Sequence, residues 1–255
     1  MEIIDFREYD GEDRIISSHE MDEWLKSNKD SSIIIKSSLP TLDNNLEGGF
    51  QTGELYAISG PTKNGKTLFS QTLTYNFYLQ QQFSLWFTFE LPPKQFLGCF
   101  PDMPLIYMPR ILKSHDLDWV CNRILEGVQK YSTRVVFLDH LHYLFDMAKV
   151  KSPSLEIGTV IRRLKKMAID DNLLIFLMCH TSKAGVENVS YQSIRDSSFV
   201  SQESDSVLML CRTPKVAENA ATLRIEFHRR TGVIERLIKL RKIDGYIVEE
   251  DLNPF

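Results

Sequence analysis

The chain has 255 residues, of which 43% are hydrophobic and 25% are charged, and its formal net charge is −4. This balance is typical of a globular protein with a sizeable core. It excludes a strongly basic protein whose overall field attracts nucleic acid, so any contact with a polyanion must come from local loops. The four cysteines are widely spaced and form no C-x-x-C pair, which favours free thiols in a reducing compartment over disulfides or a zinc site. The acidic N-terminus lacks the apolar core of a signal peptide, and no run could span a membrane. We therefore expect a soluble intracellular protein, in the cytoplasm or an organelle matrix.

Residues 1–38 are expected to form an N-terminal extension with one short helix. Ser17 and Glu20 have the spacing of a capping box. Met21, Trp24 and Leu25 then fall on one helical face, which ends at about residue 28. Periodicity leaves two partners open for this apolar stripe, namely the core of the same chain and a neighbouring subunit.

Residues 55–67 have the pattern of a phosphate-binding P-loop. An apolar run at 55–58 predicts a strand, the run from residue 68 to about 79 predicts a helix, and G-x-x-x-x-G-K-T lies between them. The glycines let backbone N–H groups turn toward an anion at the positive end of the helix. Lys66 is expected to reach the β- and γ-phosphates, and Thr67 to help hold Mg²⁺. The residues predicted to bind the nucleotide here are Gly60, Pro61, Thr62, Lys63, Asn64, Gly65, Lys66 and Thr67.

Polar residues follow three further apolar runs that we expect to be buried strands. Glu90 follows residues 83–89, Asp139 follows 134–138, and His180 follows 173–179. Ligands of open α/β sheets bind beyond the carboxyl ends of the strands, so these side chains are well placed for chemistry. After a P-loop, an apolar strand that ends in Asp is the Walker B pattern, and Asp139 is therefore predicted to bind Mg²⁺ together with Thr67.

The remaining pattern predicts the fold class. A helix from about residue 117 is capped by Ser114 or Asp116, another helix covers 155–169, and residues 223–228 and 234–240 alternate as a hairpin around Thr231 and Gly232. Strands and helices alternate through the middle of the chain. We therefore expect an α/β fold for residues 39–255, with a mainly parallel twisted sheet, helices on both faces and a β-rich C-terminal end.

Several stretches resemble the motor domain of DnaB-like hexameric replicative helicases, which are RecA-like P-loop ATPases. The stretch from SSLPTLDNNLEGGF to the P-loop is similar to the family's entry, and four later motifs agree in order: FTFELPPKQF, FLDHLHYL, FLMCHTSK and SIRDSSFVSQESDSVLMLCR. The Asp-His pair after the Walker B strand and the Cys-His pair at residues 179–180 are most similar to the phage and mitochondrial branch.

The resemblance implies roles for particular residues. Glu90 matches the catalytic glutamate that polarises the attacking water, and His180 matches the sensor of the γ-phosphate. Arg229 in FHRRTG matches the arginine finger that reaches the site of the neighbouring subunit. Phe227 stands where the family usually has a lysine, and this leaves open whether Arg229 or Arg230 is the finger. His142 is a weaker candidate near the Walker B strand.

The resemblance also implies a function and partners. We expect an ATP- and Mg²⁺-dependent, ring-forming helicase, most often a hexamer, that moves 5′–3′ along single-stranded DNA and can engage a primase. The 1–38 helix would then be a linker that grips the adjacent subunit. Two loops are predicted to face DNA through Lys149, Lys151, Lys183 and Arg195. Two alternatives stay open, a recombination ATPase of the RecA/RadA type and a DNA-independent regulatory ATPase.

Overall fold

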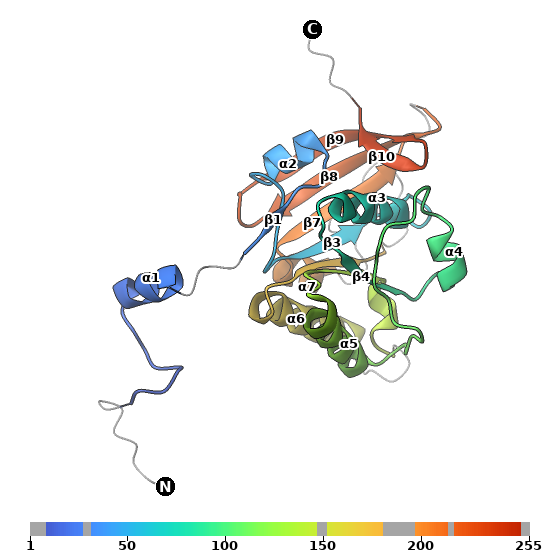
Figure 1. Cartoon of the computed structure of the whole chain (residues 1–255). Coiled ribbons are helices and arrows are strands. Elements are labelled where there is room, and N and C mark those ends of the chain that lie inside the picture. The colour runs from blue at the N-terminus through green and yellow to red at the C-terminus, as the bar shows by residue number, and fades with distance from the viewer. Residues whose placement is uncertain (1–8, 28–31, 147–151, 181–196, 214–216, 251–255) are drawn as a thin grey trace. The chain divides into compact units, whose positions relative to one another are not determined.

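The computed structural model describes residues 9–27, 32–146, 152–180, 197–213 and 217–250, and contacts divide the chain into units Met1–Ser32 and Ile33–Phe255 (Figure 1). In the first unit, helix α1 spans Ser18–Ser27. The predicted capping box is confirmed: the Ser17 amide donates to Glu20 Oε2 at 2.9 Å, and the Glu20 amide donates to Ser17 Oγ at 3.2 Å. Helix α1 has no buried residue, so the partner of its apolar stripe stays a prediction.

The second unit is built on an eight-stranded sheet with the order β10-β9-β8-β7-β3-β6-β5-β4. Its parallel part consists of β4 (Ser84–Thr88), β5 (Val135–Asp139), β6 (Leu174–Met178), β3 (Leu55–Ser59) and β7 (Ser206–Arg212). Antiparallel strands extend it from β7, namely β8 (Ala220–His228), β9 (Ile234–Ile243) and β10 (Tyr246–Glu249). The sheet is therefore parallel where the motifs lie and antiparallel at its C-terminal end, as the sequence predicts.

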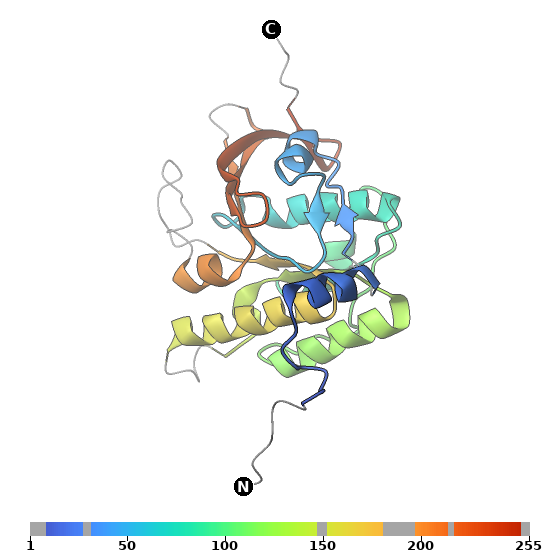
Figure 2. The same ribbon diagram turned by 90° about the vertical axis from the view of Figure 1, so that its left-hand side faces the viewer.

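Helices cover both faces of this sheet (Figures 1 and 2). One face packs against α2 (Pro40–Asn45), α3 (Lys66–Leu79) and α4 (Pro93–Leu97). The other face packs against α5 (Leu117–Tyr131), α6 (Pro153–Asp170) and α7 (Ser197–Glu203). A small sheet of β1 (Ile34–Ile35) and β2 (Phe50–Gln51) and a 3-10 turn at Leu141–Tyr143 complete the elements. Side chains on neighbouring positions of each strand alternate between two hydrophobic cores, which fixes the register of the central strands.

An aromatic column fills the core beneath α3. The ring of Phe137 stacks on Trp86 at 4.6 Å and on Phe176 at 4.7 Å between centroids, and Phe77 of α3 lies against Phe137 and Phe176. Trp86 Nε1–H also donates to Thr74 Oγ1 of α3 at 2.9 Å. These contacts join the P-loop helix to the three strands whose ends carry the candidate site.

The structure decides several local predictions. Asp116, not Ser114, caps α5, because its carboxylate accepts from the Trp119 amide at 2.8 Å. Tyr107 makes one isolated parallel bridge to Leu85 of β4. The predicted domain boundary after residue 38 stays a prediction. Among the described residues, no helix combines the length and the apolar character needed to cross a bilayer.

Candidate active site

The P-loop connects β3 to α3 in the predicted strand–loop–helix order. Gly60 has a φ of +148°, and a Cβ there would lie 2.1 Å from the Leu210 carbonyl oxygen. Gly65, immediately before α3, has a φ of +88°. These two glycines are therefore required by a close approach and by a left-handed backbone, as the phosphate-loop interpretation expects.

The Lys66 side chain folds back over this loop. Its Nζ donates to the carbonyl oxygens of Gly60 at 2.9 Å and Pro61 at 3.1 Å, and the residue is buried. Burial lowers the pKa of Lys66, although the charges of Asp139 and Glu90 oppose that shift. The ammonium is thus desolvated and held by neutral carbonyls, so it can gain more from an anion than a lysine in water can.

Other P-loop residues are exposed or tie the loop to its surroundings. Thr62 and Lys63 are exposed at the tip. Asn64 Oδ1 accepts from the Arg212 amide at 2.8 Å, and Asn64 Nδ2 donates to the Thr62 carbonyl at 3.1 Å. The loop is therefore fastened to the end of β7 as well as to β3.

Asp139, at the end of β5, meets the first turn of α3. Thr67 Oγ1 donates to Asp139 Oδ2 at 3.1 Å, and the Asp139 carboxylate is buried. Burial raises the pKa of Asp139 to about 6, and the charge of Glu90 adds to this effect. A hydroxyl and a buried carboxylate with uncompensated charge form the hard oxygen set that Mg²⁺ prefers, so these residues fit the metal that the motif implies.

Glu90 and His180 lie beside Asp139 at the same edge of the sheet. The strand register pairs Thr88 with Asp139, so the segments that follow β4 and β5 emerge together, and β6 is the next parallel strand. His180 Nε2 is 3.9 Å from Glu90 Oε1. The structure therefore brings together residues from four strand ends that the sequence predicted separately.

Sequence reasoning missed His140, the residue after Asp139. Its ring centroid is 4.2 Å from that of His180, and it is buried. Burial lowers the pKa of His140 to about 3 and that of His180 to about 4, with nearby positive groups adding to both shifts. His142 lies behind the pair, with its ring centroid 6.5 Å from that of His180. The motif FLDHLHYL shows that His140 follows Asp139. It does not show that the His140 ring lies beside His180, which comes from another strand.

The two candidate finger arginines have different environments. Arg230 Nε donates to Glu54 Oε1 at 2.8 Å, and its Nη2 donates to the Gly49 carbonyl at 3.1 Å. Arg229 is exposed, and its Nη2 donates to the Gln202 carbonyl of α7. Arg230 is thus bound to a buried carboxylate of its own domain, whereas Arg229 is exposed and contacts α7.

Glu54 is the centre of a buried polar network at the opposite end of β3. Tyr56 donates to its Oε2 at 2.5 Å, and His228 Nε2 lies 3.5 Å from the same oxygen. Burial acts to raise the pKa of Glu54, but hydrogen bonds from His228, Arg230 and Tyr56 outweigh it and lower the pKa to about 2. This carboxylate is therefore fully partnered, unlike Asp139.

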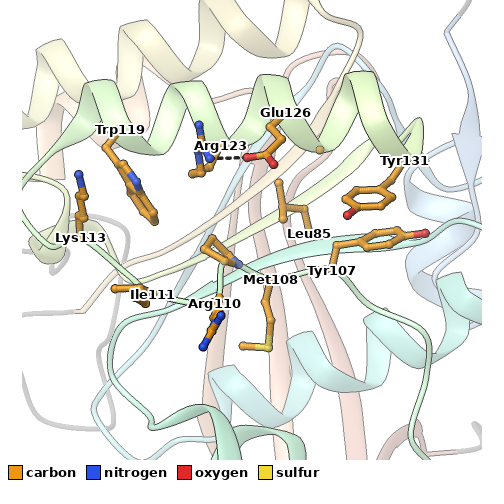
Figure 3. A pocket seen from close by; sticks show the side chains of 12 residues that line it. Leu85, Tyr107, Met108, Arg110, Ile111, Lys113, Trp119, Arg123, Glu126 and Tyr131 are labelled. Atoms are coloured by element: carbon orange, nitrogen blue, oxygen red, sulfur yellow. Dashed lines mark ion pairs between the residues drawn. The ribbon is translucent and has the colours of Figure 1, made fainter.

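The four residues predicted to contact DNA lie outside the described part of the chain and stay predictions: Lys149, Lys151, Lys183 and Arg195. A pocket of about 450 Å³ lies between α5 and residues 107–113 (Figure 3). There Tyr107 and Tyr131 stack at 4.0 Å, and Arg123 pairs with Glu126 at 2.5 Å. This pocket shares no residue with the P-loop edge.

Comparisons with known proteins agree with this geometry. A KaiC-type ATPase family model matches residues 35–103. The ATPase domain of G40P superposes with a TM-score of 0.76 and 17% identity, covering 91% of this chain and 97% of that domain. The chain has the RecA-like P-loop ATPase fold. A DnaB-like replicative helicase, solved in a study of its interactions with primase, gives a TM-score of 0.75 and 18% identity over 93% of this chain and 68% of that one. No curated protein matches the sequence.

Proposed function

We propose that this protein is an ATP hydrolase of the DnaB-like helicase type, which uses ATP at subunit interfaces to move along single-stranded DNA. The observation that carries the proposal is the meeting of a desolvated lysine, an oxygen pair suited to Mg²⁺ and a glutamate–histidine pair at one sheet edge: Lys66, Thr67, Asp139, Glu90 and His180. This is the set that phosphoryl transfer to water requires, since positioning and charge stabilisation supply most of its catalysis.

The side chains divide the work. Bound Mg²⁺–ATP supplies the phosphoanhydride bond that is broken. Lys66 balances the charge of the β- and γ-phosphates, while Thr67 and Asp139 hold the metal. Glu90 orients the attacking water and takes its proton at the carboxylate. His180 contacts the γ-phosphate and passes the change to the following loop, residues 182–198, which is predicted to bind DNA.

The position of Arg229 supports action between subunits. Its amide donates to the Asp205 carbonyl just before β7 begins, whereas the P-loop follows the far end of the neighbouring parallel strand β3. Ser206, the residue after Asp205, pairs with Tyr56 of β3, so Arg229 lies level with Tyr56. Tyr56 and Gly60 are separated by about 13 Å of extended chain, which is longer than an arginine side chain. Arg229 therefore serves the nucleotide of another copy in a ring, which we propose to be a hexamer.

The remaining parts of the proposal concern the assembly. Residues 1–38 would link neighbouring subunits through α1, and residues 39–255 would form the motor. The loops that contain Lys149, Lys151, Lys183 and Arg195 would contact single-stranded DNA, with 5′–3′ movement and a primase partner.

The first test measures ATP hydrolysis with and without single-stranded DNA over a range of salt concentrations. We expect stimulation that falls steeply with salt, because phosphate contacts release counterions. Glu90→Gln should retain nucleotide binding and lose hydrolysis, while Glu218→Gln, an exposed control, should hydrolyse normally. DNA-stimulated hydrolysis that survives in Glu90→Gln would show that the catalytic assignment is wrong.

The second test examines the shared site. Arg229→Ala and Lys66→Ala should each be inactive alone, whereas a mixture should regain hydrolysis at interfaces that combine an intact P-loop with an intact arginine. Arg230→Ala, whose partner Glu54 lies in the same chain, should instead lower stability. A mixture without recovered activity, from protein that stays monomeric with an ATP analogue, would contradict the ring.

The second candidate is a regulatory ATPase that does not need DNA, because the KaiC-type match covers residues 35–103, which include the P-loop but none of the four residues predicted to contact DNA. It predicts hydrolysis that is insensitive to single-stranded DNA. A recombination ATPase would instead promote strand exchange without displacing a strand from a duplex. Strand-displacement and strand-exchange assays on the same preparation therefore separate these functions.

A further inference from the structure

Three metal-ligating side chains converge beyond the ends of β4, β5 and β6. One ligand atom from each of Glu90, His140 and His180 lies within 4.8 Å of the others. The three strands are hydrogen-bonded neighbours, and the three residues lie one or two positions beyond their carboxyl ends. The parallel sheet therefore brings the three segments to the same edge.

Hydrogen bonds among these groups do not account for their approach. The 3.9 Å between His180 Nε2 and Glu90 Oε1 is too long for a hydrogen bond. His180 Nδ1 is buried and has no hydrogen-bond partner in the described part of the chain. The His140 and His180 rings meet nearly edge to face, at an interplanar angle of 71°. The His142 amide donates to His140 Nδ1 at 3.4 Å, and among the described residues no hydrogen bond joins His140, His180 and Glu90 to one another.

The local charges favour a cation. Glu90 and Asp139 bring two carboxylates to this edge, whereas Lys66 supplies one ammonium that acts on both histidines and opposes a second cation. Two carboxylates against one ammonium give this edge an excess of negative charge. His142 Nδ1 lies 3.4 Å from His140 Nδ1. A residue that contacts a metal-ligating histidine in this way can fix the orientation of its ring.

We propose that Glu90, His140 and His180 form a binding site for a transition-metal dication of the Zn²⁺ class, distinct from the Mg²⁺ pair Thr67 and Asp139. Two imidazole nitrogens and one carboxylate oxygen are a ligand set that Zn²⁺ takes with a fourth position open, whereas Mg²⁺ prefers oxygen throughout. Tetrahedral bonds of about 2.1 Å place ligand atoms about 3.4 Å apart, so the cluster must contract by about 1.4 Å at most.

Metal bound there regulates the site. It occupies Glu90, which is then unable to take a proton from water, and it fixes His180, but it leaves Lys66 and Thr67 available to the nucleotide. Zn²⁺ therefore inhibits hydrolysis without displacing ATP. This consequence rests on the proposed function, whereas metal binding itself does not.

Binding is measured on nucleotide-free protein, with Zn²⁺ titrated against a chromogenic chelator. A Cys99→Ser background removes the exposed thiol as a competing ligand. We expect one Zn²⁺ per chain, with affinity reduced roughly tenfold or more in both His140→Asn and His180→Asn. His115→Asn, which changes an exposed histidine on another loop, is the matched control and should bind Zn²⁺ normally. Co²⁺ in place of Zn²⁺ should give the visible absorption of a tetrahedral site.

Circular dichroism melting establishes that each variant is folded, and Glu90→Gln replaces any variant that is not. Affinities equal to that of His115→Asn in either histidine variant would overturn the proposal. In ATPase assays at buffered Zn²⁺, the maximal rate should fall at unchanged KM, with an inhibition constant equal to the measured Kd. Zn²⁺ binding by a protein without ATPase activity would refute the proposed function and retain the site, whereas an active ATPase that does not bind Zn²⁺ would refute the site.

Discussion

Buried carboxylates lie beyond both ends of β3 and have opposite environments: Glu54 precedes the strand, and Asp139, from the end of β5, contacts the P-loop that follows it. At the amino end, Glu54 accepts hydrogen bonds from Tyr56 and Arg230 and lies beside His228, and its pKa is lowered to about 2. At the carboxyl end, Asp139 accepts from Thr67, and its pKa is raised to about 6. The Glu54 carboxylate is hydrogen-bonded to cationic and neutral partners, whereas the Asp139 carboxylate accepts from one hydroxyl and can still bind a cation. The contrast separates groups that stabilise the fold from groups that the fold holds ready for a ligand.

The largest expected effect is on catalysis at the carboxyl end. Lys66→Ala should reduce ATP hydrolysis roughly 100-fold or more, because it removes the positive charge that faces the phosphates. Stability should change little, since the ammonium contacts only neutral carbonyls among the described residues. Lys94→Ala, an exposed lysine on α4, is the control. Hydrolysis close to that of the parent protein would remove Lys66 from the site.

The next effect is on stability at the amino end. Glu54→Gln should lower the free energy of unfolding by about 3 kcal/mol, because Arg230 and His228 lose a buried negative partner. Nucleotide binding should persist. Glu250→Gln, which breaks the exposed pair with Arg241, should cost less than about 1 kcal/mol. Urea denaturation compares the two, and equal losses would mean that the Glu54 network adds nothing beyond a surface ion pair.

The same network predicts a response to acid. The pKa of Glu54 is lower in the folded protein, about 2, than its ordinary value of 4.5. Its contribution is therefore present above pH 4.5 and is lost as the pH falls toward 2, a change of about 3 kcal/mol. The difference in unfolding free energy between the parent protein and Glu54→Gln should shrink over this range. A constant difference would contradict the lowered pKa.

The smallest effect has the opposite sign. Asp139→Asn should stabilise the nucleotide-free protein by about 1–2 kcal/mol at neutral pH, because it removes a buried charge close to Glu90. Hydrolysis should be lost with the metal ligand. Asp170→Asn, at an exposed ion pair with Lys166, should change stability little. Destabilisation by Asp139→Asn would show that the two ends of β3 are alike.

Local patterns predicted one end of β3 better than the other. The P-loop spacing and the apolar runs before Glu90, Asp139 and His180 lie within short windows, and parallel strands place their ends together. The amino-end network joins Glu54 to His228 and Arg230, which are 174 and 176 positions away, and no local pattern pairs them. The sequence placed Arg229 at the finger position and left Arg230 as an alternative, and the contact between Arg230 and Glu54 shows that their environments differ.

The aromatic column gives the protein a built-in optical signal. Trp86 is fully buried, stacks on Phe137 and donates to Thr74 of α3, whereas Trp24 is exposed. Emission from an indole in such a dry, stacked environment lies at shorter wavelength than emission from one in water. A shift in the P-loop helix would alter the polarity around the Trp86 indole, so we expect the fluorescence of Trp86 to change on nucleotide binding in a protein whose other two tryptophans are replaced by phenylalanine.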